Sequence, residues 1–378
     1  MKYLFFVMPA HGHMNPTLAV AEELVRRGEE VIYYTTEEFA ESVKNVGAKA
    51  RLIPPHFNPV YVLKQKAMEM GLDLKKRDPQ LMLHFLKNIR LKAHELVDQV
   101  KAEEADAAVY DPMCTWGHEI IQTLRLPAAT FMTSFAMKKG TSLMDYIANR
   151  VPEVSEIIEV FTVEEELNIV TIPKEFQIQP DAFDDRYLFV GPLISRRNIK
   201  HDLPLNQLAN EPVLYISLGS ILSNVDFYKC CIEAFGYTSW KVVLNIGRQT
   251  NPKDIEPIPD NFIVRQFVPQ LEVLKVADVF ITHGGMNSAM ESLWFGVLPV
   301  VVPQSSDQPI VAEQIKRLGL GEVIQPDQIS ADTLIQAVNR AMDDKEMKQR
   351  LCKMKESLHQ IDGIALAVDH LQKRFRRS

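Results

Sequence analysis

Short apolar runs alternate with amphipathic segments along the first forty residues. Residues 2–10 ("KYLFFVMPA") predict a buried strand, residues 15–28 ("NPTLAVAEELVRRG") carry apolar side chains at helical spacing, and residues 29–36 ("EEVIYYTT") predict a second strand. Pro16 stands near the predicted start of the helix, where its missing N–H is not needed. A strand, a helix and a strand joined by short links predict a parallel sheet with helices on its faces.

The second half of the chain repeats this alternation. Its apolar runs of strand length are residues 212–220, 241–247, 261–268, 278–283 and 297–303. A polar, proline-containing stretch before them predicts a linker at 194–211. We therefore expect two doubly wound α/β domains, at 1–193 and 212–355, that bind ligands in a cleft near the carboxyl ends of their strands. Residues 356–378 are predicted to form a C-terminal helix.

The composition narrows the class of protein. The chain has 378 residues, with 42 Lys and Arg against 49 Asp and Glu, and its formal charge of −7 gives no support to nucleic-acid binding. The four cysteines show no metal or disulfide spacing, and the apolar start is too short for a secretion signal. No run approaches the roughly 18 apolar residues of a membrane span. The basic residues at 373–377 are interpreted as a solvated helix end rather than a membrane contact. We expect a cytoplasmic protein.

The segment "DVFITHGGMNSAMES" (278–292) predicts a strand, a turn and a helix. Two glycines in the turn allow the backbone to approach a ligand closely, and the amino end of the new helix suits a phosphate group. His283 and Ser288 can donate hydrogen bonds to phosphate, and Glu291 lies one helical turn beyond Ser288, where its carboxylate suits a ribose diol. The alternative is a plain helix N-cap with His283 on the surface, but it explains neither the double glycine nor Glu291.

The flanking segments strengthen the first interpretation. Phe267 could stack on a base, and Asp307 and Gln308 could bind sugar hydroxyls. The ordered run P-Q…T-H-G-G-x-N-S-x-x-E-S…G-V…P…D-Q resembles the donor-binding signature of UDP-sugar-dependent glycosyltransferases that act on small lipophilic acceptors. Within that family the chain looks most like the bacterial macrolide- and flavonoid-type enzymes, which have the two-domain GT-B fold. The resemblance also covers "MPAHGHMNPTLAVAEEL" and "NIVTIPKEFQIQPDAFDDRYLFVGP", and so nearly the whole chain.

The resemblance assigns the donor site residue by residue. Phe267 matches the ring that stacks on uracil, a position where plant members carry Trp. Gln270 and Glu291 match the ribose ligands, and the turn "SLGS" resembles a second phosphate loop. The candidate donor-binding residues are Gly219, Ser220, Phe267, Val268, Gln270, His283, Gly285, Met286, Asn287, Ser288, Glu291, Asp307 and Gln308.

The resemblance places the catalytic residues in the first domain. His13, in the turn "GHMNP" after the first strand, matches the general base that deprotonates the acceptor, a role suited to an imidazole. Asp111 follows another predicted strand and matches the carboxylate that orients the imidazole. His11 shares the face of His13 if the segment is extended, but the match is to the histidine after Gly12.

These matches imply a reaction. The activated acceptor oxygen attacks the anomeric carbon opposite UDP, and an α-linked UDP-sugar gives a β-glycoside. The sequence has no D-x-D motif, and we expect no metal and no cofactor; UDP-sugar is a co-substrate. The partners are the UDP-sugar and a small-molecule acceptor. Glucose is the commonest sugar in the family, while galactose and N-acetylglucosamine stay open, as does the oligomeric state.

Other functions are less consistent with the motifs. An esterase-like hydrolase, suggested by "HGG", would need a G-x-S-x-G elbow, which is absent. A nucleotide-sugar epimerase, a transferase with lipid or cell-wall acceptors, and a UDP-sugar-binding protein without chemistry are the remaining alternatives.

The acceptor side is the least defined part of the sequence. The chain between Asp111 and the linker is shorter than in relatives, which leaves the acceptor undefined. Met113, Met132, Met137 and Met144 line an adaptable acceptor pocket or pack in the core. The last helix is expected to pack back on the first domain, as in relatives.

Overall fold

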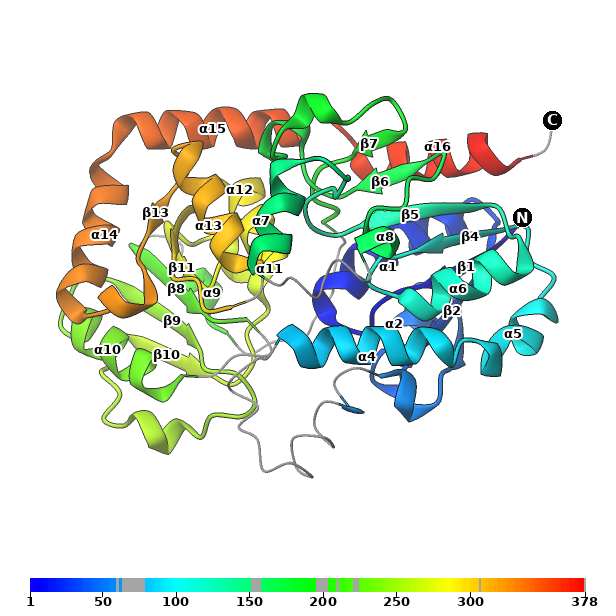
Figure 1. Cartoon of the computed structure of the whole chain (residues 1–378). Coiled ribbons are helices and arrows are strands. Elements are labelled where there is room, and N and C mark those ends of the chain that lie inside the picture. Colours follow the sequence, from blue (N-terminus) through cyan, green and yellow to red (C-terminus); the bar gives the residue numbers. More distant parts are fainter. Residues whose placement is uncertain are drawn as a thin grey trace. The chain divides into compact units, whose positions relative to one another are not determined.

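The computed structural model describes residues 1–58, 61–62, 79–150, 158–194, 203–208, 211–219, 224–305 and 307–376. The chain divides into two compact units, which we call unit 1 (Met1–Ser195 with Ile361–Ser378) and unit 2 (Arg196–Gln360). Each unit is built on its own sheet, and every strand pair in both sheets is parallel. The prediction of two doubly wound α/β domains is confirmed (Figure 1).

Unit 1 contains a seven-stranded sheet of order β3-β2-β1-β4-β5-β6-β7. Its strands are β1 (Lys2–Phe6), β2 (Glu30–Thr35), β3 (Lys49–Leu52), β4 (Ala107–Tyr110), β5 (Ala128–Met132), β6 (Asn168–Val170) and β7 (Tyr187–Phe189). Its helices are α1 (His11–Arg26), α2 (Glu37–Asn45), α4 (Pro79–Leu91), α5 (His94–Lys101), α6 (Thr115–Leu124), α7 (Ser142–Arg150), α8 (Ile158–Phe161) and α16 (Gly363–Phe375).

The apolar run of β1 is buried on both faces of this sheet. Tyr3 and Phe5 face a core shared with α1, α2 and α16, whereas Leu4 and Phe6 face a core shared with α4, α5 and α6. Successive side chains of a strand point to opposite faces, so helices on both faces require an unbroken apolar strand. The apolar pattern of residues 2–6 therefore follows from the position of β1 inside the sheet, and the strand ends four residues before the predicted end at residue 10.

Unit 2 contains a six-stranded sheet of order β10-β9-β8-β11-β12-β13. Its strands are β8 (Val213–Ser217), β9 (Lys241–Asn245), β10 (Phe262–Arg265), β11 (Val279–Thr282), β12 (Leu298–Val301) and β13 (Glu322–Val323). Its helices are α9 (Leu205–Leu208), α10 (Val225–Phe235), α11 (Gln270–Leu274), α12 (Met286–Phe295), α13 (Gln308–Arg317), α14 (Ala331–Asp343) and α15 (Lys345–His359).

Two segments differ from the sequence prediction. Part of the predicted linker belongs to unit 2, because α9 forms within it and Leu203 and Leu208 are buried in the unit 2 core. The predicted C-terminal helix is divided: α15 ends at His359, and α16 begins at Gly363 with Asp362 as its N-cap. The Asp362 carboxylate accepts a hydrogen bond from the Ala365 amide at 3.0 Å, which is a side-chain signal for a new helix.

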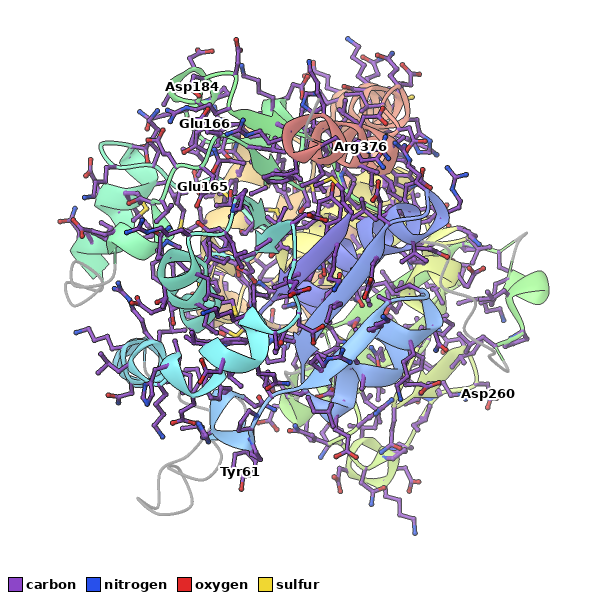
Figure 2. The ribbon with its side chains drawn as sticks, turned by 90° about the vertical axis from the view of Figure 1, so that its right-hand side faces the viewer. Tyr61, Glu165, Glu166, Asp184, Asp260 and Arg376 are labelled. Atoms are coloured by element: carbon purple, nitrogen blue, oxygen red, sulfur yellow. The ribbon has the colours of Figure 1, made fainter. Side chains whose placement is uncertain are left out.

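Helix α16 packs on α1 within unit 1. Glu29, between α1 and β2, binds this helix and the residue that follows it. Its buried carboxylate accepts hydrogen bonds from Gln372 at 2.5 Å and from Arg376 at 2.7 Å. Arg376, labelled in Figure 2, follows the last turn of α16. The N-terminal ammonium of Met1 binds the other oxygen of Glu29. The C-terminal helix is thus part of unit 1 although it follows unit 2 in the chain.

The start of α1 also differs from the prediction. The helix begins at His11 rather than at Asn15, so "HGHMN" is its first turn and not a loop. Ala10, the N-cap, makes no side-chain capping hydrogen bond, and the sequence therefore lacked a start signal at this point. Pro16 stands in the sixth position of the helix, where it cannot donate to the carbonyl of Gly12. The expectation that its missing N–H is not needed was therefore wrong.

Candidate active site

Three polar side chains of unit 1 meet where neighbouring strands end. Asp111 directly follows β4, Thr133 directly follows β5, and His13 lies in the first turn of the helix after β1. These strands are adjacent in the order β1-β4-β5, and all are parallel. Their carboxyl ends therefore share one edge of the sheet, which is where such folds bind ligands.

His13 is held by a buried carboxylate. Its Nδ1 lies 2.5 Å from Oδ2 of Asp111, whose side chain is 3% exposed, while the His13 side chain is 28% exposed. Oδ1 of Asp111 accepts a hydrogen bond from the Met113 amide at 2.8 Å. Because a carboxylate only accepts hydrogen bonds, this arrangement places the His13 proton on Nδ1 and makes Nε2 the basic nitrogen.

Thr133 is a site residue that the sequence did not reveal. Its hydroxyl oxygen lies 3.1 Å from Nδ1 of His13, and the residue is 7% exposed. A single threonine carries no motif, and its only available signal was its place at the end of an apolar strand, beside the strand that Asp111 follows. Asp111 and Thr133 together fix the imidazole from the same side of the ring.

His11 points away from this cluster. Its ring contacts Phe39 edge-on, with centroids 5.0 Å apart, and its Nε2 lies 3.5 Å from Glu38. Residues two apart on a helix point about 200° apart, so His11 cannot share the face of His13. The expectation of a shared face, which assumed an extended segment, was wrong.

In unit 2, His283 lies between two glycines at the end of β11. A Cβ atom on Gly219 would lie 2.8 Å from Cε1 of His283, and one on Gly285 would lie 2.6 Å from its Nε2. Gly219 also has a φ of +83°, a conformation that favours glycine. The two loops leave room for the imidazole only because both positions lack a side chain. A plain N-cap would not require this arrangement.

The amino end of α12 follows at once. Gly285 is its N-cap, and Met286 begins the helix. The positive end of the helix dipole and the His283 ring therefore lie side by side, which suits an anion such as a diphosphate. Asn287 is half-buried in the first turn of the helix, and the Met286 side chain is buried.

Gln270 and Glu291 form a hydrogen-bonded pair. Nε2 of Gln270, at the start of α11, donates to Oε2 of Glu291 at 2.6 Å and lies 3.2 Å from the hydroxyl of Ser288. Glu291 and Ser288 are both buried and lie one turn apart on α12. The structure thus brings the two predicted ribose ligands together.

The remaining donor candidates differ in burial and in the contacts of their side chains. Phe267 is 48% exposed, and the Arg248 guanidinium lies 5.9 Å from the centre of its ring. Val268 is buried in the unit 2 core, so its side chain is engaged in packing. Asp307 is half-buried at the N-cap of α13. Ser220 lies outside the described residues.

Gln308 has a structural partner of its own. It is buried, and its side-chain oxygen accepts hydrogen bonds from the amides of Gln304 at 2.8 Å and Ser305 at 3.0 Å. The side-chain carbonyl therefore shapes the loop before α13.

The comparison with known proteins decides the family. The chain is 35% identical to the NDP-glycosyltransferase YjiC of Bacillus subtilis, over 98% of this chain and 96% of that protein. It is 33% identical to the YjiC protein of Bacillus licheniformis, over 97% and 96% of the two chains. The chain belongs to this glycosyltransferase family.

Two further similarities agree with that assignment. Residues 230–360 of the transferase match the family described as erythromycin biosynthesis protein CIII-like, C-terminal domain. The crystal structure of CalG4, the calicheamicin glycosyltransferase, superposes with a TM-score of 0.82 at 26% identity and covers 99% of this chain and 98% of CalG4. The predicted GT-B fold and the predicted resemblance are confirmed.

Three further features of the transferase bear on the predictions. Met132 and Met144 are buried, so packing accounts for these two, whereas Met113 and Met137 are only half-buried against the unit 1 core. Within the described ranges, no helix combines the length and the apolar character that crossing a membrane would need.

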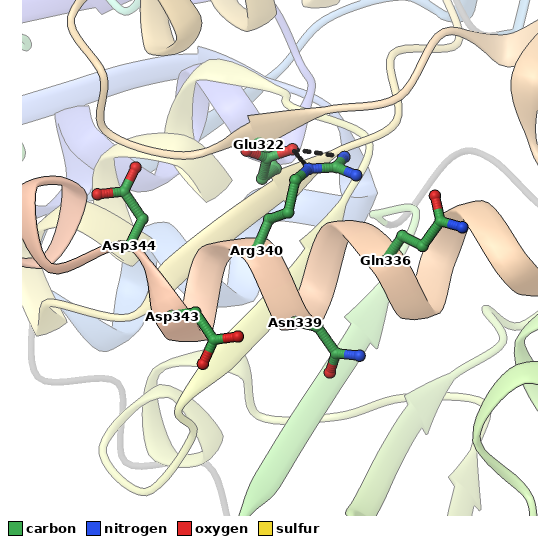
Figure 3. A pocket seen from close by; sticks show the side chains of 6 residues that line it. All are labelled: Glu322, Gln336, Asn339, Arg340, Asp343 and Asp344. Carbon is green, nitrogen blue, oxygen red and sulfur yellow. Dashed lines mark hydrogen bonds and ion pairs between the residues drawn. The ribbon is translucent and has the colours of Figure 1, made fainter.

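A hollow of about 660 Å³ lies over α14, and its lining includes the ion pair of Arg340 and Glu322 (Figure 3). None of the predicted site residues lines it.

Proposed function

We propose that this glycosyltransferase moves glucose from UDP-glucose to a hydroxyl group of a small lipophilic acceptor, such as a macrolide or a flavonoid, with inversion at the anomeric carbon. The hydrogen bond of 2.5 Å between His13 and Asp111 carries the proposal, because it supplies an oriented base for a hydroxyl. The acceptor class is supported by the similarity to an erythromycin biosynthesis protein and to a calicheamicin glycosyltransferase.

Proton removal by the base accompanies the attack on the sugar. Nε2 of His13 takes the proton of the acceptor hydroxyl as the oxygen forms its bond to the anomeric carbon. Asp111 stabilises the resulting imidazolium through the Nδ1 proton and does not itself take the proton. The proton then leaves His13 for solvent, and the base is restored.

The leaving group departs with the electron pair of the broken bond. The bond between the anomeric carbon and the diphosphate oxygen breaks, and UDP is released. The added negative charge stays on the diphosphate, where the amino end of α12 and the His283 ring stabilise it, so the proposal needs no metal ion. Attack opposite UDP turns an α-linked sugar into a β-glycoside.

The choice of UDP rests on the pair of Gln270 and Glu291 and on Phe267. A carboxylate with an adjacent amide can bind the two ribose hydroxyls. The half-exposed ring of Phe267 offers a face to uracil. Glucose is proposed over galactose and N-acetylglucosamine only because it is the commonest sugar in the family.

The test uses UDP-glucose, UDP-galactose and UDP-N-acetylglucosamine in EDTA, each with a macrolide and a flavonoid acceptor. Mass spectrometry detects the sugar adduct, and NMR coupling of the anomeric proton assigns the linkage. We expect a β-glucoside that His13→Ala does not make and that His11→Ala makes at the wild-type rate. An adduct formed only with added metal, or an α-linked product, would contradict the mechanism. UDP binding without any adduct would contradict the acceptor class.

A further inference from the structure

A buried tyrosine lies behind the predicted ribose ligands. Tyr215, on β8, is fully buried, and its ring stacks on Phe280 of β11 with centroids 4.6 Å apart. Its hydroxyl donates a hydrogen bond to Oε1 of Gln270 at 3.2 Å. The stacked ring leaves the hydroxyl little freedom, so the position of the donor is set by the sheet itself.

The neighbouring groups fix the orientation of the Gln270 amide. Its Nε2 faces Glu291, which only accepts hydrogen bonds, so its Oε1 must face a donor. Tyr215 is that donor. Without the hydroxyl, Oε1 loses its donor, and the amide is held only through Nε2, by Glu291 and Ser288.

Tyr215 keeps its proton under all ordinary conditions. Burial raises the pKa of Tyr215 far above its usual value and outweighs the smaller effects of Ser217, which lowers the pKa, of the Glu291 charge, which raises it, and of Asn245, which lowers it. The hydroxyl can therefore serve as a hydrogen-bond donor throughout the pH range of an enzyme.

We propose that Tyr215 is a positioning residue, which holds the Gln270 amide in the one orientation that presets Gln270 and Glu291 for the ribose of the donor. The inference rests on the proposed UDP-sugar donor. Tyr215 does not touch the ligand itself; it acts through Gln270. Its loss should weaken the recognition of the ribose hydroxyls and leave the binding of base and diphosphate intact.

The experiment compares two ligands by calorimetry, UDP and 2′,3′-dideoxyuridine diphosphate, which lacks both ribose hydroxyls. In Tyr215→Phe we expect the affinity for UDP to fall about tenfold and that for the dideoxy compound to change less than about twofold. The ratio of the two affinities should therefore fall about tenfold. This ratio does not depend on the fraction of folded protein.

Tyr228→Phe is the matched control. Tyr228, on α10, is a fully buried tyrosine of the same unit and has no contact with Gln270, Glu291 or Tyr215 among the hydrogen bonds of the described residues. Loss of the Tyr228 hydroxyl should leave the affinities for UDP and for the dideoxy compound unchanged.

A second variant keeps the inference falsifiable if Tyr215→Phe does not fold. In Gln270→Ala the hydroxyl of Tyr215 no longer has Gln270 to act through. Adding Tyr215→Phe to that variant should then change the affinity for UDP by less than about twofold. A further loss of about tenfold in the double variant would overturn the inference.

The remaining outcomes separate this inference from the proposed function. If the wild type does not bind UDP, the proposed donor is wrong, and the inference fails with it. If the wild type prefers UDP over the dideoxy compound but Tyr215→Phe keeps the same preference, only the inference is overturned. An equal loss of affinity for both ligands would show a general structural role and would also overturn it.

Discussion

Each unit has a histidine near the carboxyl ends of its strands. In unit 1 the histidine is hydrogen-bonded to a carboxylate, whereas in unit 2 it lies between two glycines. His13 has a charged partner on Nδ1, the buried Asp111, and about a quarter of its side chain is exposed. His283 lies against Gly219 and Gly285, at the positive end of a helix. A carboxylate favours proton uptake by the ring, while a helix amino end favours a bound anion.

The same side chain is therefore placed for two different tasks. In unit 1 the surroundings suit removal of a proton, and in unit 2 they suit binding of a diphosphate. The comparison predicts that changes around His13 alter the rate of transfer and leave the donor affinity intact, and that changes around His283 alter the donor affinity.

The largest effect is expected for Asp111→Asn. The Met113 amide would hold the new side-chain oxygen, and the new NH₂ group would face Nδ1 of His13. The proton would move to Nε2, which could no longer act as a base, so the rate should fall by about 10³–10⁴. Steady-state kinetics measure the transfer rate, and calorimetry measures the affinity for UDP. A loss of UDP affinity in parallel with the rate would show that the surroundings of His13 do not act on proton removal alone.

A large effect on the stability of unit 1 is expected for Glu29→Gln, because Glu29 holds α16 in that unit. Burial raises the pKa of Glu29, but hydrogen bonds from the N-terminal ammonium, Arg376 and Gln372 together lower it. Since the pKa is lowered on folding, the stabilisation is complete above the ordinary value of 4.5 and is lost as the pH falls below it. At pH 7 the free energy of unfolding should fall by roughly 2–3 kcal/mol.

Urea unfolding, followed by the fluorescence of Trp116 in unit 1 and of Trp240 and Trp294 in unit 2, measures this change. The matched control is Glu30→Gln, which removes an exposed ion pair with Lys49 and should change the stability by less than about 0.5 kcal/mol. A difference between wild type and Glu29→Gln that persists unchanged at pH 3 would contradict the assignment.

A smaller effect is expected for Gly219→Ala, which adds a methyl group beside His283. The control is Gly28→Ala, because Gly28 has nearly the same φ, +84° against +83°, but no atom within 4 Å of an added Cβ. Both changes should lower stability by about 1 kcal/mol through backbone strain. Only Gly219→Ala should weaken UDP binding, by about tenfold, as the ring is displaced. Equal UDP affinities in the two variants would show that the position of His283 is not needed.

The smallest effect is expected for Phe267→Trp. A larger ring increases the stacking area for uracil, and the affinity for UDP should rise about twofold to fivefold. The control is Phe267→Leu, which keeps an apolar side chain without a ring and should lower the affinity. Fluorescence titration measures both. If the leucine variant binds UDP as the wild type does, the ring does not stack on the base.

The sequence predicted the sheets better than the contacts. Buried parallel strands are unbroken apolar runs, and residues 2–10 and 29–36 therefore indicated strands directly. The pairing of His13 with Asp111 came from the family resemblance. The two residues are 98 positions apart, and their contact depends on β4 lying beside β1, which no local pattern records.

Other features lacked a signal or had a misleading one. The first turn of α1 has no capping side chain and contains Gly12 and, soon after, Pro16, which suggested a loop. Thr133 and Tyr215 act through single hydroxyls whose partners lie far away in the chain. In contrast, the break between α15 and α16 did have a signal, since Asp362 is a favoured N-cap residue.

The central claim is that unit 1 removes the proton and unit 2 binds the donor. The most direct test measures UDP affinity and glucosyl transfer side by side on His13→Ala and His283→Ala. We expect His13→Ala to bind UDP within about twofold of wild type while transfer falls by at least about 10², and His283→Ala to bind UDP about tenfold more weakly. If His13→Ala lost UDP affinity as strongly as His283→Ala, or if His283→Ala bound UDP normally, the two histidines would not have separate tasks.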